Sequence, residues 1–355
     1  MKDIPVTVKR SIELMGMFLI GSIIVACDTI IMPLLMAFFF SLMLMPVFRF
    51  FRKIHIPEVI AIFLPILILA IITGLVIWVF SSQVGLLLDD FPQITQNVTR
   101  HLDNLSTWIS SSFGFSPTEQ LNFINEQSKK LFSSAGSVLR GAAGSLSGFI
   151  IFFGLLPIYI YLIMMYRNLF LKFILMWFDK KDHENVEEGI RQTETMVKSY
   201  LIGLLIQITY IIILLGGCLM LFGIKNALLI GILFALLNLI PYLGAFIGNI
   251  LGVLITLASS ENIVDILIVL GAITVVQFLD NNILMPRIVG SQVKINPLTS
   301  IVGIIVGGAM AGISGMFLAM PILSVLKIVF DRSADYKQWG ILLGDDRPTK
   351  SPMKI

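Results

Sequence analysis

An all-α, polytopic membrane fold is predicted by the composition of the chain and by its apolar runs. Hydrophobic residues make up 57% of the 355 residues and charged residues only 13%, and the mean hydropathy is +0.93. A soluble domain of this length needs more charge on its surface. The apolar runs recur at about 20 residues, the length that spans a bilayer as a helix, whereas a β-barrel would show alternating segments of about 10 residues.

Five apolar runs in the first two thirds are each expected to form one membrane helix. Lys9 and Arg10 precede the first run as in a signal peptide, but no small-residue cleavage pattern follows, so we expect this helix to be retained. The runs are 11–28, 30–48, 59–88, 147–166 and 199–222.

Basic residues set the predicted orientation. Three basic segments fall on one side if each run crosses once, and that side should be the cytoplasm. They are Lys2 to Arg10, Arg49 to Lys53, and the helical region 167–198. Both termini are then cytoplasmic, with a tail at 332–355.

The region 89–145 is expected to lie outside and to form amphipathic helices. These helices are either a cap over the membrane part, a substrate gate or an oligomer contact.

The last third predicts two broken helical hairpins in a core at 199–331. Residues 226–258 have two apolar arms around Pro241, Tyr242 and Gly244, and residues 296–330 repeat this shape around Gly312 to Gly315. An arm of about 15 residues reaches about 22 Å, short of a hydrocarbon core of about 30 Å. One ordinary span near 263–280 lies between the two hairpins. The five earlier runs, the two hairpins and this span together make about eight membrane elements. The hairpins enter from opposite faces; two full crossings per hairpin are the alternative.

Glycines spaced by four mark these hairpins. Gly244, Gly248 and Gly252 share one helix face, and so do Gly303 and Gly307. Small residues at this spacing let helices approach backbone to backbone. The glycines are therefore expected to serve helix packing. The alternative is a functional role, in which they form a smooth face along which a mobile unit slides.

A polar cluster follows the last ordinary span, in the stretch FLDNNILMPRIVG at 278–290. Gln277, Asp280 and Asn281 stand at i, i+3 and i+4, on one helical face. This is either a helix end meeting water or a carboxylate held inside the bundle, where its cost marks function. The predicted solute or ion pathway comprises Asn238, Pro241, Tyr242, Gly244, Gln277, Asp280, Asn281, Asn282, Pro286, Arg287, Gly312, Ser314 and Gly315. We expect the two hairpin tips to approach each other beside Gln277 and Asp280.

The sequence predicts no cofactor and no metal site. Its two cysteines form no CxxC spacing, and a net charge of +3 gives no nucleic-acid signal. No ATP-binding motif of the G-x-x-x-x-G-K-[ST] kind is present, so transport would run on a solute or ion gradient.

PYLG at 241–244, QFLDNNILMPRIVG at 277–290 and NPLTSIVGIIVGGAMAGISGMFLAMPILSVLK at 296–327 resemble the autoinducer-2 exporter family, the PerM-like permeases. The resemblance covers essentially the whole chain. It implies a bacterial inner-membrane protein that exports a small quorum-sensing solute. It also implies a homo-oligomer, with pentamers known among relatives, and some relatives are described as sodium/proton antiporters.

Four functions are weighed. The first is secondary transport of a small polar solute, in which Asp280 and Arg287 pair with each other or with a coupling proton or sodium ion. The second is a sodium/proton antiporter that uses Asp280. The third is an intramembrane protease, because Gly312 to Gly315 match G-x-S-G, but no histidine lies inside a span to activate the serine, so we expect no enzyme. The fourth is a pore or scaffold built around the outer helices.

Overall fold

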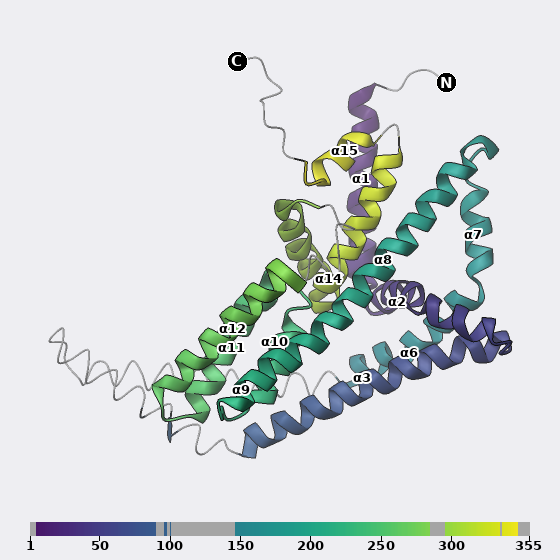
Figure 1. Cartoon of the computed structure of the whole chain (residues 1–355). Coiled ribbons are helices and arrows are strands. Elements are labelled where there is room, and N and C mark those ends of the chain that lie inside the picture. The colour runs from purple at the N-terminus through teal and green to yellow at the C-terminus, as the bar shows by residue number, and fades with distance from the viewer. Residues whose placement is uncertain are drawn as a thin grey trace, which may run out of the picture. The chain divides into compact units, whose positions relative to one another are not determined.

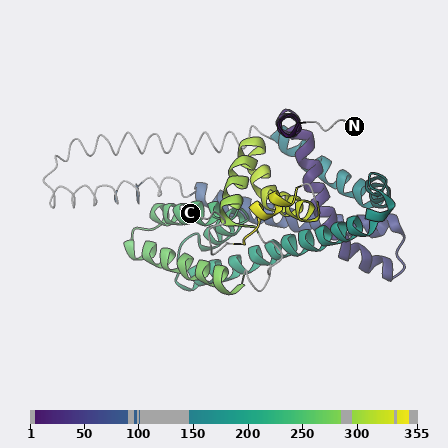
Figure 2. The ribbon, with the colours of Figure 1, turned by 90° about the horizontal axis from the view of Figure 1, so that it is seen from above.

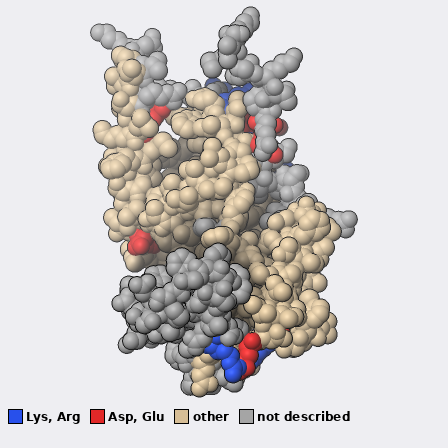
Figure 3. Space-filling model, turned by 90° about the vertical axis from the view of Figure 1, so that its left-hand side faces the viewer, with Lys and Arg blue, Asp and Glu red and all other residues tan. Residues whose placement is uncertain are grey.

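The structure is a computed structural model that describes residues 5–89, 96, 97, 100, 146–284, 295–333 and 336–346. These residues are almost entirely helical and include no strand (Figure 1). Within them, five helices are long and apolar enough to cross a membrane, or six if one bent pair counts as a span. The face drawn in Figure 3 is mostly uncharged, with charged residues only in small groups. The prediction of a polytopic helical membrane protein is therefore confirmed.

The chain divides into two compact units. One comprises residues 1–68, 151–202 and 289–355, and the other residues 69–150 and 203–288. We refer to them as unit 1 and unit 2. Most of the insert predicted at 89–145 lies outside the described residues, as do Pro286 and Arg287.

Unit 1 collects helices from both ends of the chain. Its first helices are α1 (Val6–Ala26), α2 (Asp28–Lys53) and the start of α3 (Glu58–Asp89). Next come most of α6 (Leu146–Met165), α7 (Arg167–Leu175), the short turn η1 (Lys180–Asp182) and the first part of α8 (His183–Ile211). The last are α14 (Pro297–Arg332) and α15 (Lys337–Leu343). The start of α14 is well specified, because the Asn296 side chain accepts from the Thr299 N–H at 2.8 Å and Pro297 follows it.

The polar groups of unit 1 link segments that are far apart in the sequence. Arg49 pairs with Glu194 at 2.7 Å, and the Arg332 guanidinium donates to the side chains of Asn185 and Gln192. In addition, the hydroxyl of Tyr336, just before α15, lies 3.5 Å from the carboxylate of Glu13 on α1. Segments predicted to be cytoplasmic thus contact one another, and the residue before the last described helix contacts the first helix. Which membrane face they occupy stays a prediction.

The long helix α14 is a hairpin rather than a single span. Its helical dihedrals fail at Ala311 (φ −149°, ψ 27°) and Gly312 (φ 58°, ψ −141°). Beyond this break the chain returns along itself, since a Cβ on Gly315 would lie 1.9 Å from the Gly307 carbonyl oxygen. The 36 residues of α14 would be long enough to cross a membrane as one straight helix. Because the chain folds back within α14, this length is not evidence for a full crossing. This is the second hairpin that the sequence predicts.

Unit 2 contains the end of α8 and the helices that follow it. These are the π-helix η2 (Ile212–Gly216), α9 (Gly217–Leu221), α10 (Ala227–Leu237), α11 (Leu243–Ser259), α12 (Ile263–Leu279) and the π-helix η3 (Asp280–Leu284). Figure 2 shows α11 and α12, in green, running side by side. A cluster of buried apolar side chains from α8 to α12 forms the core, with Ile211, Leu215, Phe234, Val269 and Ile273 among its members.

Helices α10 and α11 form the first predicted hairpin. Its ends are joined because the Asn226 side chain donates to the Ser259 hydroxyl at 2.8 Å. Its tip reverses through Tyr242, whose φ is 66°. A Cβ on Gly244 would lie 1.9 Å from the Leu237 carbonyl oxygen, so the arms touch backbone to backbone. The 11 residues of α10 extend about 16 Å, well short of a bilayer core.

Most of these glycines serve close packing within a hairpin, and Gly252 faces Ile273 of α12. A Cβ on Gly248 would meet the Phe234 ring at 2.6 Å, and one on Gly303 would meet the Leu323 side chain at 2.4 Å. Both neighbours belong to the opposite arm of the same hairpin. These faces are occupied by the chain itself, so they give no support to a free sliding surface.

Helix α8 crosses the predicted boundary between the helical region 167–198 and the membrane core, because it runs unbroken from His183 to Ile211. No proline interrupts this stretch, and polar residues alone do not end a helix. Helix α8 therefore carries a polar first half and an apolar second half.

Candidate transport site around Asp280

Helix α12 positions the one acidic side chain that is buried in the described part of the chain. The helix begins after Asn262, whose side chain accepts from the Val264 N–H at 3.1 Å, and it ends where Asp280 opens the π-helix η3. Asp280 is only 2% exposed and lies within the apolar span Ile263–Leu284. A buried carboxylate at this depth costs free energy unless it is hydrogen-bonded or paired.

Three neutral side chains donate hydrogen bonds to the Asp280 carboxylate. Gln207 Nε2 donates to Oδ2 at 2.9 Å, and Asn238 Nδ2 donates to the same oxygen at 3.1 Å. The Tyr210 hydroxyl donates to Oδ1. We call Gln207, Tyr210, Asn238 and Asp280 the Asp280 cluster. All four residues belong to unit 2.

The backbone around the cluster departs from the α-helix at two points. The π-helix η2 begins two residues after Tyr210, and η3 begins at Asp280 itself. Single π-turns of this kind are often found at functional sites. Asn238 follows the last residue of α10 and so lies at the tip of the first hairpin. The cluster therefore joins the hairpin tip to the ends of two helices.

One spare acceptor lies in the cluster and another lies one turn before Asp280. Among the described residues, Gln207 Oε1 and Gln277 Oε1 are buried without a hydrogen-bond partner. No Lys or Arg in the described part of the chain bonds Asp280. An unpaired buried acceptor costs about 1–3 kcal/mol. Oxygen atoms of this kind suit either a cation or the hydroxyl groups of a small solute.

The predicted polar cluster is only partly assembled. Asp280 and Asn238 come together, and Gln277 lies one turn before Asp280 and donates to Asn281 Oδ1 at 3.2 Å. Gln277 and Asn281 share a helical face, and Asn281 and Asn282 are exposed, whereas Asp280 is buried. The regular 3.6-residue helical period ends at Asp280, where the π-helix begins.

The remaining predicted residues fall into three groups. Pro241, Tyr242 and Gly244 form the tip that follows Asn238 in unit 2. Gly312, Ser314 and Gly315 form the tip of α14 in unit 1, and the expected approach of the two tips stays a prediction. Pro286 and Arg287 lie outside the described residues, so the expected Asp280–Arg287 pair is untested.

Two members of the cluster, Gln207 and Tyr210, are absent from the predicted site. They lie in the second half of α8, about 70 positions before Asp280 in the sequence. Gln207 is a polar residue inside an apolar run, and Tyr210 follows it at i+3 on the same side of the helix. A single amide in a membrane span is itself a signal of function, and this signal could have found both residues.

A comparison with known proteins identifies the family to which the chain belongs. Residues 12–335 match the model of the family described as "AI-2E family transporter". The chain belongs to this family of transporters. The resemblance carried by its last third is therefore confirmed.

Relatives in this family align over most of the chain. YrrI of Bacillus subtilis (strain 168) is 24% identical over 307 residues, which cover 85% of this chain and 86% of YrrI. YhhT of Escherichia coli (strain K12) is 25% identical over 326 residues, which cover 91% of this chain and 90% of YhhT. The names of both proteins describe transport and give no substrate. "AI-2 transport protein TqsA" of Escherichia coli (strain K12) is 28% identical over 122 residues, 34% of this chain and 35% of TqsA.

Proposed function

We propose that the chain is a secondary transporter that exports a small polar solute such as autoinducer-2, driven by a proton or sodium gradient through Asp280. The observation that supports this most is the Asp280 carboxylate, which is buried in an apolar span and, among the described residues, accepts hydrogen bonds only from neutral side chains. A carboxylate with an arginine partner is already neutralised. No Lys or Arg within the described residues pairs with Asp280, so its oxygens would be available to a small cation.

The geometry suggests how ion and solute would be coupled. Hydrogen bonds to a charged carboxylate are roughly twice as strong as neutral ones. When a proton or sodium ion neutralises Asp280, its bonds from Gln207, Tyr210 and Asn238 weaken. The freed donors can then bind solute oxygens, and the hairpin tip that carries Asn238 is released from α12. Occupancy of Asp280 would in this way bias the tip between two positions, as alternating access requires.

A sodium/proton antiporter is the alternative, and the same carboxylate favours it. In this case sodium and protons would compete for Asp280, with the spare oxygens of Gln207 and Gln277 as further ligands. Oxygen ligands of this kind suit a hard cation. The two functions differ in what crosses the membrane together with the ion.

Flux through reconstituted vesicles separates these possibilities. Purified protein in liposomes would be given a proton gradient or a sodium gradient in separate experiments. Autoinducer-2 movement and internal pH would be followed in each. Solute flux driven by one gradient supports the first function, and sodium-dependent proton movement without solute supports the second. Vesicles that move neither solute nor ions faster than empty liposomes would contradict both.

Orientation and assembly are further proposals. We place the protein in the bacterial inner membrane with both termini in the cytoplasm, on the basis of the distribution of Lys and Arg. Single cysteines at Lys180 and at position 110, in a background without Cys27 and Cys218, would be labelled from opposite sides.

A homo-oligomer, with a pentamer as the first expectation, rests on family resemblance alone, because the glycine faces pack within the hairpins. Mass measurement in native lipid tests it.

A further inference from the structure

Helix α7 follows directly after a membrane span and turns sharply away from it. Residues Gly154–Met165 of α6 and Arg167–Leu175 of α7 are inclined by 62°. The bend lies at Tyr166, whose backbone (φ −95°, ψ 12°) interrupts the helix. The nine residues of α7 extend only about 13 Å. A short helix at a steep angle to the span before it is placed to lie along the membrane surface.

The first turn of α7 is fixed to the rest of unit 1. The Arg167 guanidinium lies 3.2 Å from the Glu58 carboxylate and stacks over the Phe48 ring at 4.7 Å. It also donates to the Met164 carbonyl at 2.8 Å, which closes the end of α6. The angle between α6 and α7 is therefore held by specific contacts.

None of the side chains of α7 is buried, and most of them are exposed. Leu169, Phe170 and Phe173 share one face of the helix with Trp177, which follows it. Trp177 is 75% exposed and packs edge to face on Phe173. Aromatic side chains of this kind are enriched where the bilayer meets water. The exposed apolar face is thus suited to insertion among lipid tails.

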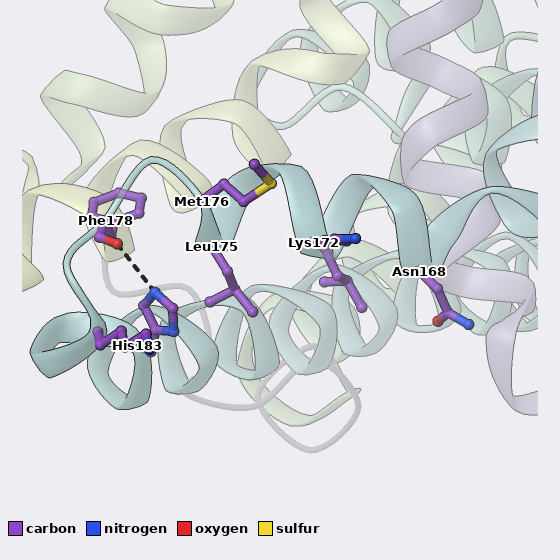
Figure 4. A pocket seen from close by; sticks show the side chains of 8 residues that line it. Asn168, Lys172, Leu175, Met176, Phe178 and His183 are labelled. Atoms are coloured by element: carbon purple, nitrogen blue, oxygen red, sulfur yellow. Dashed lines mark hydrogen bonds between the residues drawn. The ribbon is translucent and has the colours of Figure 1, made fainter.

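The other face of α7 borders an open pocket of about 650 Å³, which His183 at the beginning of α8 also lines (Figure 4). Asn168, Lys172, Lys180 and His183 supply its polar lining, and Leu171, Leu175, Met176 and Phe178 supply its apolar lining. His183 Nε2 donates to the Phe178 carbonyl at 3.1 Å, which holds the turn between the two helices.

The charges of this pocket are all of one sign. Lys172 and Lys180 lack an acidic partner among the described residues, whereas the neighbouring Lys181 pairs with Asp179 at 3.5 Å. The pocket contains no Asp or Glu in its lining. Two unpaired ammonium groups above an apolar floor are complementary to an anionic, amphiphilic ligand.

We propose that this pocket binds an anionic phospholipid of the membrane leaflet in which α7 lies. The phosphate would contact Lys172 and Lys180, and the glycerol and first acyl carbons would cover Leu171 and Leu175. A free inorganic anion would leave this apolar lining exposed to water, which disfavours it. The pocket volume lies within the usual range for small-molecule sites, about 300–1,000 Å³. The site belongs to unit 1 and involves none of the residues of the Asp280 cluster, so it stands independently of the transport proposal.

Native mass spectrometry of the full chain tests the proposal. The protein would be titrated with phosphatidylglycerol or with phosphatidylcholine of the same acyl chains, and bound lipids counted. We expect preferential retention of phosphatidylglycerol. A lysine near an anionic lipid surface contributes about a fivefold change in binding, so Lys172→Gln with Lys180→Gln should weaken retention at least about tenfold. Lys181→Gln is the matched control and should change it less than about twofold.

Three results would overturn the lipid site. Equal retention of the two lipids would remove the charge argument. Unchanged phosphatidylglycerol retention in the double variant would place the lipid elsewhere. Displacement of the lipid by inorganic phosphate alone would identify a site for a free anion. Because both lysines are exposed, the melting temperature of the double variant without added lipid should equal that of the unmodified protein. This comparison separates lost binding from lost folding.

Discussion

Replacing Asp280 with asparagine removes a charge while keeping the shape of the side chain. The two amide donors, Gln207 Nε2 at 2.9 Å and Asn238 Nδ2 at 3.1 Å, share Oδ2. A single amide oxygen at that position retains both bonds. The new NH₂ group would then face the Tyr210 hydroxyl, which can rotate from donor to acceptor. Asp280→Asn therefore changes the strength of the bonds more than their number.

The expected stability change is the difference of two opposing terms. A hydrogen bond to a charged group contributes about 1.5–3 kcal/mol and a neutral one about 0.5–1.5 kcal/mol, so three bonds lose about 3 kcal/mol together. Removing a buried carboxylate recovers a desolvation cost of several kcal/mol. We expect the free energy of unfolding of Asp280→Asn to stay within about 2 kcal/mol of the original. Asp280→Leu instead strands three donors and should lose at least about 3 kcal/mol.

Transport and stability would be measured on the same preparations. Asp280→Asn should insert and fold but lose gradient-driven flux in proteoliposomes. Asp265→Asn is the matched control, because Asp265 lies at the opposite end of α12 and accepts from the Ser260 hydroxyl at 2.5 Å. It should retain flux. Normal flux in Asp280→Asn would refute a transport role for this carboxylate, and instability as large as that of Asp280→Leu would assign it a structural role.

Two further substitutions address the donors and the hairpin. Tyr210→Phe removes one donor to Asp280, which should cost about 1.5–3 kcal/mol of stability and slow flux. Unchanged flux in proteoliposomes would exclude this hydroxyl from the site. Gly244→Ala forces a Cβ to within 1.9 Å of the Leu237 carbonyl oxygen, so its melting temperature should fall. Gly271→Ala, where nothing lies within 4 Å, should not change the melting temperature, and equal effects of the two would contradict the hairpin packing.

Much of the fold is predictable because membrane spans and their interruptions leave local signals. The hairpin expected at 226–258 is closed by Asn226 and Ser259, and the one expected at 296–330 breaks at Ala311 and Gly312. Length, glycine and proline suffice for such elements, since an arm that is too short cannot cross the bilayer. A change from polar to apolar residues does not show whether one helix or two cross residue 199, and the structure has one continuous helix, α8, there.

The site was predictable only in part because its contacts span long sequence separations. Asp280 and Asn238 are marked locally by the cost of polar groups in a membrane span. The contribution of Gln207 depends on how α8 packs against α12 and the hairpin tip, which no local pattern encodes. Helical spacing predicts that Asn281 lies beside Gln277, which donates to it, but does not indicate that Asn281 is exposed while Asp280 is buried.

Reactivity of a cysteine at position 277 tests most directly whether the Asp280 cluster lies on a transport pathway. Gln277 lies one turn before Asp280 and has a buried, unpartnered oxygen, but it makes no bond to the carboxylate. In a background without Cys27 and Cys218, Gln277→Cys should react with a membrane-impermeant thiol reagent, and the transported solute should slow the reaction. Ile273→Cys, one turn earlier at a fully buried position, should stay unreactive. A cysteine at position 277 that no reagent reaches from either side of the membrane would contradict the account.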